Sequence, residues 1–445
     1  MSIIRKIDAI KETLAQAVKM AESFNVDAFE IHCSIDQGHV IGVRNQLPET
    51  LEFNLTQHLG IEVYYQGRTG YAETTDLSTQ SLRSVVQNAV TIARHTEKDP
   101  FSGIVKKGVL TQAKRLDYLY RPWQEFTIEN AIEQAKACEA YALKEKDIFR
   151  SDGVTINSFE MLHGFANSHG FLDVYPETKH SISAEFIAKD KHGMQRDDAY
   201  YVNHDFTALP TLQQIAEKAI SRTLARRNPR HIKSGNLPVI FSPNIASAMI
   251  GNLLAALKGS RQYHKNTFLY QKLNEKVIAE TISIIEKPDI IGAIASRPYD
   301  DEGVNKGTSP IITGGKVERY LLSSYSARQL KLETTGNAGG ISNIEIVTRH
   351  KCCEKEMISN LKEGVLIHET MGRGVSLTTG NYSQGAMGFY IENGEIQYPI
   401  DNFTVVGNLN EMLNNIQGIA YDNIDTNTAI RIGSMLIENC FISGE

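Results

Sequence analysis

The sequence predicts an α+β fold: an N-terminal α+β domain over residues 1–230, with a mixed or antiparallel sheet and long helices, and a C-terminal β-rich domain over residues 231–445. Helical and alternating apolar patterns occur in blocks and do not alternate regularly, which argues against a doubly wound sheet. The segment 228–238 holds two prolines, a glycine and several charges, as domain boundaries often do. A length of 445 residues suits two or three domains.

The first elements are predicted from apolar spacing. Five apolar residues recur at helical spacing and predict a helix over 7–21: Ile7, Ile10, Leu14, Val18 and Ala21. Alternating apolar residues then predict strands over 29–35, 40–44, 49–55, 60–65 and 69–74. We expect the dipeptide Gln66-Gly67 to turn the chain between the last two strands.

The middle and the end of the chain continue this pattern. We expect helices over 78–95, 127–143 and 212–226, with Thr127 as an N-cap, and β-structure over 153–206. Beyond the boundary, a short strand at 239–241 precedes a small apolar helix at 245–257. From about residue 290 the chain is expected to be mostly β with glycine turns.

Composition excludes several classes of function. The net charge of −6 includes no long basic run, so no direct nucleic-acid binding is expected, and the cluster from Arg226 to Lys233 is interpreted as a solvated linker. Charges interrupt the first twelve residues, which argues against a signal peptide or membrane span. Five scattered cysteines without a C-x-x-C fit reduced thiols in the cytoplasm.

The dipeptide His368-Glu369 is the most tempting candidate for a zinc peptidase site. Such a site needs a second histidine one helical turn further on, on the same face. Here Gly372, Arg373 and Gly374 follow, which supply no ligand and break a helix. We therefore expect a packing or surface role for His368 and Glu369.

Two further motifs also favour structural roles. The run Asp300-Asp301-Glu302 lacks calcium-loop spacing, and a solvated turn is expected there. The glycine-rich stretch 335–340 lacks the lysine and hydroxyl residue of a P-loop, so a loop packed closely against another backbone is expected. No Gly-x-Ser-x-Gly elbow is present.

The stretch from Met371 to Pro399 is the most specific motif in the sequence. It reads MGRGVSLTTG, then NYSQGAMGFY, then IENGEIQYP. It resembles the C-terminal signature of the PmbA (TldE) branch of the TldD/PmbA peptidase family, whose older name is modulator of DNA gyrase. Asn381 stands where aspartate is usual, and Gln384 where arginine is usual. Supporting matches occur at 44–52, 67–72, 166–171, 301–304 and 334–338, so the resemblance covers nearly the whole chain.

The resemblance implies a two-subunit cytoplasmic metallopeptidase in which a TldD-like partner carries zinc. By comparison, the zinc-helix positions fall in 245–257 at Gly251, Asn252 and Ala256, which supply neither ligands nor a base. TldD's cysteine ligand would fall within 420–431, which holds no cysteine. No metal is therefore expected in this chain, and the partner is expected to hold the zinc. The resemblance also implies peptide or unfolded substrates, with roles in peptide-antibiotic maturation and antitoxin degradation.

The signature segment also has a physical interpretation. Asn393-Gly394 favours a type I′ hairpin turn between two short β segments. The hairpin is expected to complete a sheet; the alternative is a sheet edge that recruits an extended peptide by main-chain hydrogen bonds. The candidate peptide-binding or partner-facing residues are Thr379, Gly380, Asn381, Tyr382, Ser383, Gly385 and Phe389.

Three functions remain open at the level of sequence. The first is a non-catalytic subunit paired with a TldD-like partner, with a homodimer possible in isolation. The second is a metal-free binding protein that modulates DNA gyrase or another target. The third, with less support, is an independent peptidase that uses an unrecognised site.

Overall fold

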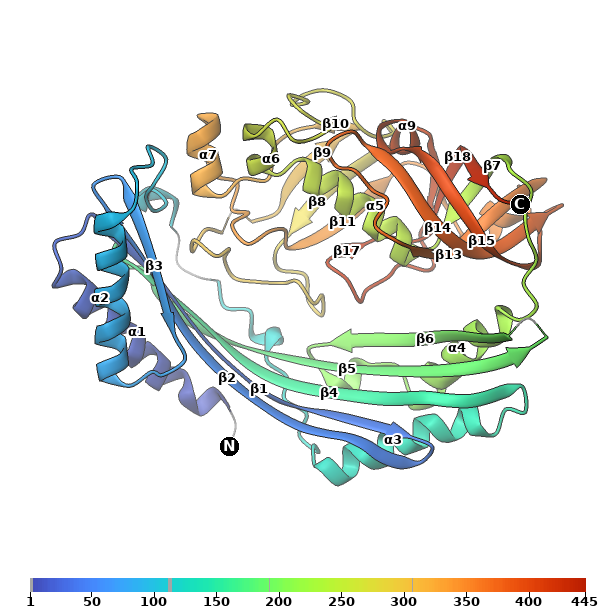
Figure 1. Cartoon of the computed structure of the whole chain (residues 1–445), viewed down its shortest axis with the longest axis horizontal. Coiled ribbons are helices and arrows are strands. Elements are labelled where there is room, and N and C mark those ends of the chain that lie inside the picture. Colours follow the sequence, from blue (N-terminus) through green and yellow to red (C-terminus); the bar gives the residue numbers. More distant parts are fainter. Residues whose placement is uncertain (1–2, 111–113, 192, 306) are drawn as a thin grey trace.

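A computed structural model describes residues 3–110, 114–191, 193–305 and 307–445 of the chain. A six-stranded antiparallel sheet with four α-helices occupies the N-terminal half, and two further sheets form most of the C-terminal half. The predicted α+β class is confirmed. Figure 1 shows the first sheet curving around the C-terminal half.

The strands of the N-terminal sheet are long and lie in the order β3-β2-β1-β4-β5-β6. The predicted strands 29–35 and 40–44 are one strand, and so are 49–55 and 60–65. Polar residues interrupt the apolar alternation there, but main-chain pairing continues. At Gly38 a Cβ would lie 2.4 Å from the Ser158 carbonyl oxygen, which explains the glycine within β1. The bounds are β1 Ala28–Arg44, β2 Leu47–Tyr65, β3 Arg68–Thr74, β4 Ile148–Asn167, β5 Leu172–Asp190 and β6 Gly193–Asn203.

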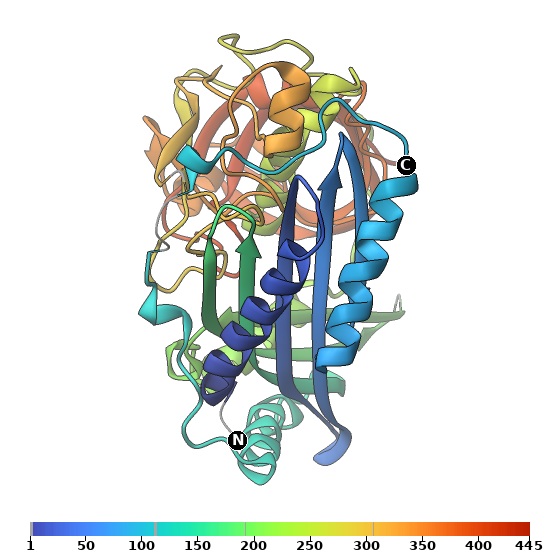
Figure 2. The same ribbon diagram turned by 90° about the vertical axis from the view of Figure 1, so that its left-hand side faces the viewer.

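Four helices cover the outer face of this sheet. At one end α1 and α2 bury an apolar cluster with β1 and β2, and in Figure 2 both helices lie across the strands. At the other end α3 and α4 bury a second cluster with β4 and β5. The predicted N-cap is confirmed, since the Thr127 hydroxyl accepts the Asn130 N–H. The bounds are α1 Ile7–Glu22, α2 Thr79–His95, α3 Ile128–Leu143 and α4 Leu212–Ala225.

The C-terminal half contains a seven-stranded sheet in which five strands close into a ring. β7 pairs with both β13 and β18, so the ring runs β7-β13-β14-β15-β18, and β16 and β12 extend it. A closed ring leaves few free edges. The bounds are β7 Gly235–Phe241, β12 Lys351–Cys352, β13 Glu363–Met371, β14 Asn381–Glu392, β15 Glu395–Asn408, β16 Ile416–Ala420 and β18 Met435–Ser443.

A five-stranded sheet of order β10-β9-β8-β11-β17 and five short helices complete this half. The largest apolar cluster of the C-terminal half includes seven buried residues of α5. The remaining bounds are β8 Ile282–Lys287, β9 Ser309–Thr313, β10 Lys316–Val317, β11 Asn343–Thr348, β17 Ile430–Arg431, α5 Pro243–Ala256, α6 Gly259–Tyr263, α7 Ser324–Leu330, α8 Glu354–Ser359 and α9 Leu409–Asn414. Among the described helices, none combines the length and apolar character needed to cross a membrane.

Polar contacts join the two halves at several places, two of which involve arginines. Near α7, the Arg328 guanidinium donates to the carbonyl oxygens of Phe101 and Ile104, at 2.6 and 3.1 Å. At the end of α4, Arg226 bridges β6 and β13. The space between the N-terminal sheet and the C-terminal half therefore has fixed walls.

Candidate functional site

Helix α5 places the three zinc-helix positions inside the C-terminal core. Ala256 is fully buried, while Gly251 and Asn252 are half-buried. The helix contains no histidine, cysteine, aspartate or glutamate. Across the described ranges, no group of three or more such side chains is placed to hold a metal ion. These residues do not fit the zinc site that the family resemblance implies for the partner.

The signature segment begins with a tight turn before β14. Gly380 has a φ of +80°, and a Cβ there would lie 2.9 Å from the Asn408 side chain. The Asn408 amide donates to the Thr379 carbonyl at 3.0 Å and to the Asn381 side chain at 3.2 Å. Tyr382 is buried in the C-terminal core. The glycine and the polar neighbours therefore fix the entry into β14.

The rest of β14 is paired on both sides. Gly385 pairs with Met371 of β13 and with Thr404 of β15. Beyond the end of β13, the Gly374 carbonyl accepts the Ser383 N–H at 2.7 Å. The hypothesis of a free sheet edge is wrong for β14, because β13 and β15 already use its main-chain groups. The interpretation that it completes a sheet is the one that the topology supports.

The structure also places the hairpin turn and the candidate residue Phe389. Asn393 and Gly394 have φ values of 52° and 80°, as a type I′ turn requires, so the predicted turn is confirmed. The Phe389 ring lies edge-on to His368, with centroids 5.9 Å apart. His368 is in strand β13, at a register shift between Ile367 and Glu369, and not in a helix. Burial, and next the charge of Arg222, lower the pKa of His368 to about 4.

Glu369 takes part in a contact that the sequence did not predict. Its carboxylate lies 2.6 Å from Arg226, which also contacts Asp197 at 3.0 Å. Asp197 also forms an ion pair with Arg222, whose Nε lies 3.0 Å away. The prediction of a solvated linker is wrong for Arg226, because two acids that lie far from it in sequence bury its side chain. Arg230 is exposed, as predicted, and its guanidinium lies over the Tyr398 ring, 4.3 Å from the centroid.

The prediction of a solvated acidic turn at 300–302 is wrong for Asp300 and Glu302, whereas Asp301 is exposed, as predicted. Asp300 is buried and accepts N–H bonds from Glu302, Val304 and Ala338, at 2.9 to 3.0 Å. Glu302 is half-buried and accepts both the N–H and the hydroxyl of Ser324. Three backbone N–H groups replace the water that the Asp300 carboxylate loses on burial. A short sequence motif does not reveal such donors.

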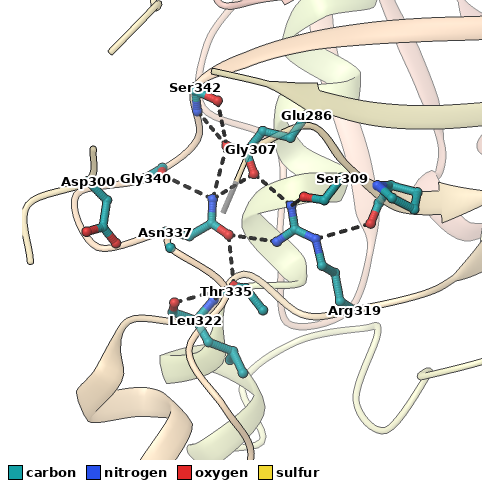
Figure 3. Close-up of polar contacts among 12 residues, drawn as sticks. Glu286, Asp300, Gly307, Ser309, Arg319, Leu322, Thr335, Asn337, Gly340 and Ser342 are labelled. Atoms are coloured by element: carbon teal, nitrogen blue, oxygen red, sulfur yellow. Dashed lines mark hydrogen bonds and ion pairs between the residues drawn. The ribbon is translucent and has the colours of Figure 1, made fainter. Parts of the chain in front are cut away.

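The glycine-rich loop 335–340 supports this acidic turn (Figure 3). The Asn337 amide donates to both carboxylate oxygens of Glu286, at 3.0 and 3.1 Å, and its oxygen accepts from Arg319 at 2.8 Å. Arg319 also contacts Glu286 at 2.7 Å. A Cβ on Gly339 would lie 2.0 Å from the Asp301 carboxyl. The predicted close packing of this loop is confirmed, although its closest neighbour is a side chain.

Between the two halves lies a cavity of about 410 Å³ with an acidic wall, which we call the interdomain cavity. The N-terminal sheet supplies Glu30, His32, Glu62 and Tyr64, and the acidic turn supplies Asp301 and Glu302. The remaining lining residues are Thr69, Asp99, Ser102, Gly103, Tyr325 and Ala338.

Burial changes the chemistry of two carboxyl groups in this cavity. It raises the pKa of Glu30 to about 8, and the charge of Glu302 adds to the effect. It raises the pKa of Glu302 to about 7 against the opposing hydrogen bonds from Ser324. Perturbed carboxyl groups in a cavity are a common mark of functional sites.

Glu30 and Glu62 were not predicted from the sequence, although the alternation of their strands indicates where they lie. Each alternates with apolar residues that face the helices: Phe29 and Ile31 in β1, and Ile61 and Val63 in β2. Period-two alternation places both acids on the opposite, inner face of the sheet. The register Glu30↔Glu62 then makes them neighbours.

Comparisons with known proteins agree along the whole chain. Residues 34–93, 121–227 and 234–444 match domain 1, the central domain and the C-terminal domain of the PmbA/TldA metallopeptidases. The chain is 38% identical to metalloprotease PmbA of Escherichia coli O157:H7, covering 100% of this chain and 99% of that protein. It is 34% identical to a PmbA homologue of Buchnera aphidicola, with full coverage of both. A TldD homologue of Haemophilus influenzae is 20% identical over 92% of this chain and 88% of its own.

Solved structures share the fold. A candidate modulator of DNA gyrase from Bacteroides thetaiotaomicron superposes with a TM-score of 0.92 at 24% identity, covering 99% of this chain and 100% of its own. TldE from Thermococcus kodakarensis superposes with a TM-score of 0.85 at 20% identity, covering 97% of this chain and 100% of its own.

Proposed function

Because this chain belongs to the TldD/PmbA metallopeptidase family as a PmbA-type member, we propose that it is the metal-free subunit of a peptidase complex whose zinc is held by a TldD-like partner. Helix α5 carries the proposal: no residue at Gly251, Asn252 or Ala256 can bind zinc or act as a base. The substrates are peptides or unfolded chains in the cytoplasm.

A surface suited to such a partner lies on strand β2. From Leu47 to His58 no described strand pairs with its outer side, since the last residue of β3, Thr74, lies opposite Leu59. Four large apolar side chains on the same stretch are 52 to 68% exposed: Leu47, Leu51, Phe53 and Leu55. A long apolar strand edge is a surface that proteins normally cover.

We propose that the occupant of this edge is a subunit of the same fold. The equivalent strand of a homologous subunit could pair with β2 about a pseudo-twofold axis and bury both apolar rows. The metal-free chain would then shape the substrate chamber while its partner supplies the metal. In isolation, a second copy of this chain would use the same edge, which gives a homodimer.

The test is a peptidase assay with and without a TldD-like subunit, beside zinc analysis of each protein. We expect no turnover by this chain alone, and zinc-dependent turnover when both are present. Phe53→Lys should weaken their association at least tenfold, because a charge would be buried at the apolar contact. The matched control is Ile291→Lys, which alters a side chain that is 80% exposed and away from β2.

Cleavage by this chain alone would overturn the proposal in favour of an independent peptidase. A fully active partner that neither binds nor needs this chain would overturn it in favour of a separate binding protein, with DNA gyrase as one target to examine.

A further inference from the structure

The interdomain cavity collects more acids than bases. Five carboxylate residues line it: Glu30, Glu62, Asp99, Asp301 and Glu302. Two strands of the N-terminal sheet, the segment before residue 103 and the acidic turn contribute them, so the cavity exists only when both halves are folded together. A volume of about 410 Å³ lies within the range of small-ligand sites.

Glu30 has a carboxylate oxygen that lacks a hydrogen-bond donor among the described residues. It is only 5% exposed and lies against the cavity. Its Oε2 accepts the Tyr64 hydroxyl at 3.0 Å, but its Oε1 is buried with no hydrogen-bond partner among the described residues. Leaving a buried acceptor unpaired costs about 1–3 kcal/mol. A ligand that donates to Oε1 would remove this cost.

The protein's own cations near the cavity contact backbone carbonyls or Asp301, and none of the described ones pairs with Glu30. Arg328 donates to the carbonyl oxygens of Phe101 and Ile104. Arg297 donates to the Gly340 carbonyl at 2.6 Å and lies 3.8 Å from Asp301 at the rim. Burial lowers the pKa of His32, which favours its neutral form. Within the described chain, no ion pair reaches Glu30 or Glu62.

We propose that the interdomain cavity binds a primary ammonium group, which donates to Glu30 Oε1 and is neutralised by the acids around it. An ammonium carries one charge and three donors, and it can also lie over aromatic rings such as those of Tyr64 and Tyr325 in the wall. A bare metal ion fits less well, because no described group of three or more acids, histidines or cysteines has the convergent arrangement that it needs.

Binding should release a proton. Glu30, with a pKa of about 8, is largely protonated at neutral pH, and the carboxyls of Glu302, Glu62 and Asp300 help to keep it so. An ammonium nearby favours the ionised form, so uptake displaces the Glu30 proton. An amine with a pKa near 10 stays charged throughout. The affinity is therefore expected to rise between pH 6 and 9.

Ammonium groups have two plausible sources: a lysine side chain of a peptide, and a free amine. The full chain, without any zinc-bearing subunit, is titrated by calorimetry at pH 8.5. The probes are acetyl-Gly-Lys-Gly-amide, its norleucine analogue, and 1,4-diaminobutane. Tighter binding of the lysine peptide identifies a peptide source, and tighter binding of diaminobutane identifies a free amine. Either result supports the ammonium site.

Variants connect the binding to the cavity. Glu30→Gln keeps the shape of the side chain and should lower the affinity at least about tenfold, since a charged hydrogen bond is lost. Glu62→Gln should lower it several-fold. The matched control is Glu217→Gln on α4, where the residue is exposed and outside the cavity, and it should leave the affinity unchanged.

Several results would overturn the proposal. These are no binding of any amine, equal binding of the lysine and norleucine peptides, an unchanged affinity in a folded Glu30→Gln protein, or binding of Mg²⁺ or Ca²⁺ alone. Because the measurement uses the isolated chain, its failure leaves the proposed peptidase complex standing, and failure of the complex leaves the cavity standing.

Discussion

The guanidinium of Arg226 lies 2.6 Å from the carboxylate of Glu369 and so connects the end of α4 to strand β13. The same guanidinium contacts Asp197 of β6 at 3.0 Å. Arg226 is therefore the polar link between the N-terminal sheet and the C-terminal ring, and its two partners differ in exposure. The side chain of Asp197 is 2% exposed, whereas that of Glu369 is 43% exposed.

This difference predicts unequal costs of substitution. Arg226→Met should lower the free energy of unfolding by about 3 kcal/mol, because the buried Asp197 carboxylate keeps only Arg222 as a charged partner, beside the Asp198 N–H. Glu369→Gln should lower it by less than about 1 kcal/mol, since solvent screens that pair. Urea denaturation of both variants measures the two values. A larger loss in Glu369→Gln would contradict this ranking.

Neither His368 nor Glu369 should contribute to peptide cleavage by the complex. We expect His368→Ala and Glu369→Gln to keep kcat within about tenfold of the parent value, whereas loss of a general base typically costs 10²–10⁴-fold. The assay uses the chain together with a TldD-like subunit, with circular dichroism as a check on folding. A thousandfold fall in kcat of a folded variant would identify a catalytic residue here.

His368 should make the protein less stable in acid. Its folded-state pKa is about 4 and its ordinary value is 6.5, so the unfolded chain takes up the proton first as the pH falls. Stability is therefore lost between about pH 7 and pH 4, by up to about 3 kcal/mol from this group. Unfolding curves of the parent and of His368→Gln across this range should show a smaller loss of stability in the variant. His32, His39 and His180 are the same in both proteins, so the difference comes from His368.

Glu30 should have the opposite dependence on pH. Its pKa rises from 4.5 to about 8 on folding, so the folded state holds its proton more tightly than the unfolded state. Stability from this group is present below pH 4.5 and is lost as the pH rises to about 8. Glu30→Gln, which resembles the protonated form, should exceed the parent by about 2 kcal/mol or more at pH 8.5 and differ little at pH 5. Equal stabilities of the two proteins at pH 8.5 would show that folding does not raise the pKa of Glu30.

Zinc should not stabilise the isolated chain. The positions Gly251, Asn252 and Ala256 supply no ligand, so neither EDTA nor added zinc should move the Tm by more than the error of the measurement. Elemental analysis of the purified chain should show much less than one zinc per chain. One tightly held zinc that resists mild chelation would contradict this expectation.

The sequence alone was enough to determine the elements that depend on neighbours in the chain. Helical spacing located α1, the Thr127 cap fixed the start of α3, and Asn393-Gly394 fixed the type I′ turn. The residues at 371–399 were enough to indicate the family. These signals are local: each depends on a few consecutive residues and the backbone angles that they favour.

The tertiary structure determined the burial and the partners of the charged residues. Arg226, Asp300 and Glu302 belong to stretches that are typical of solvated loops, yet each is held by groups distant in sequence, such as Glu369, Ala338 and Ser324. The fate of a charge depends on which donors and acceptors surround it after folding, and no local pattern encodes that. The interdomain cavity is of this kind: its acids come from β1, β2, the segment before residue 103 and the turn at 300–302, and only the packing of the two halves brings them together.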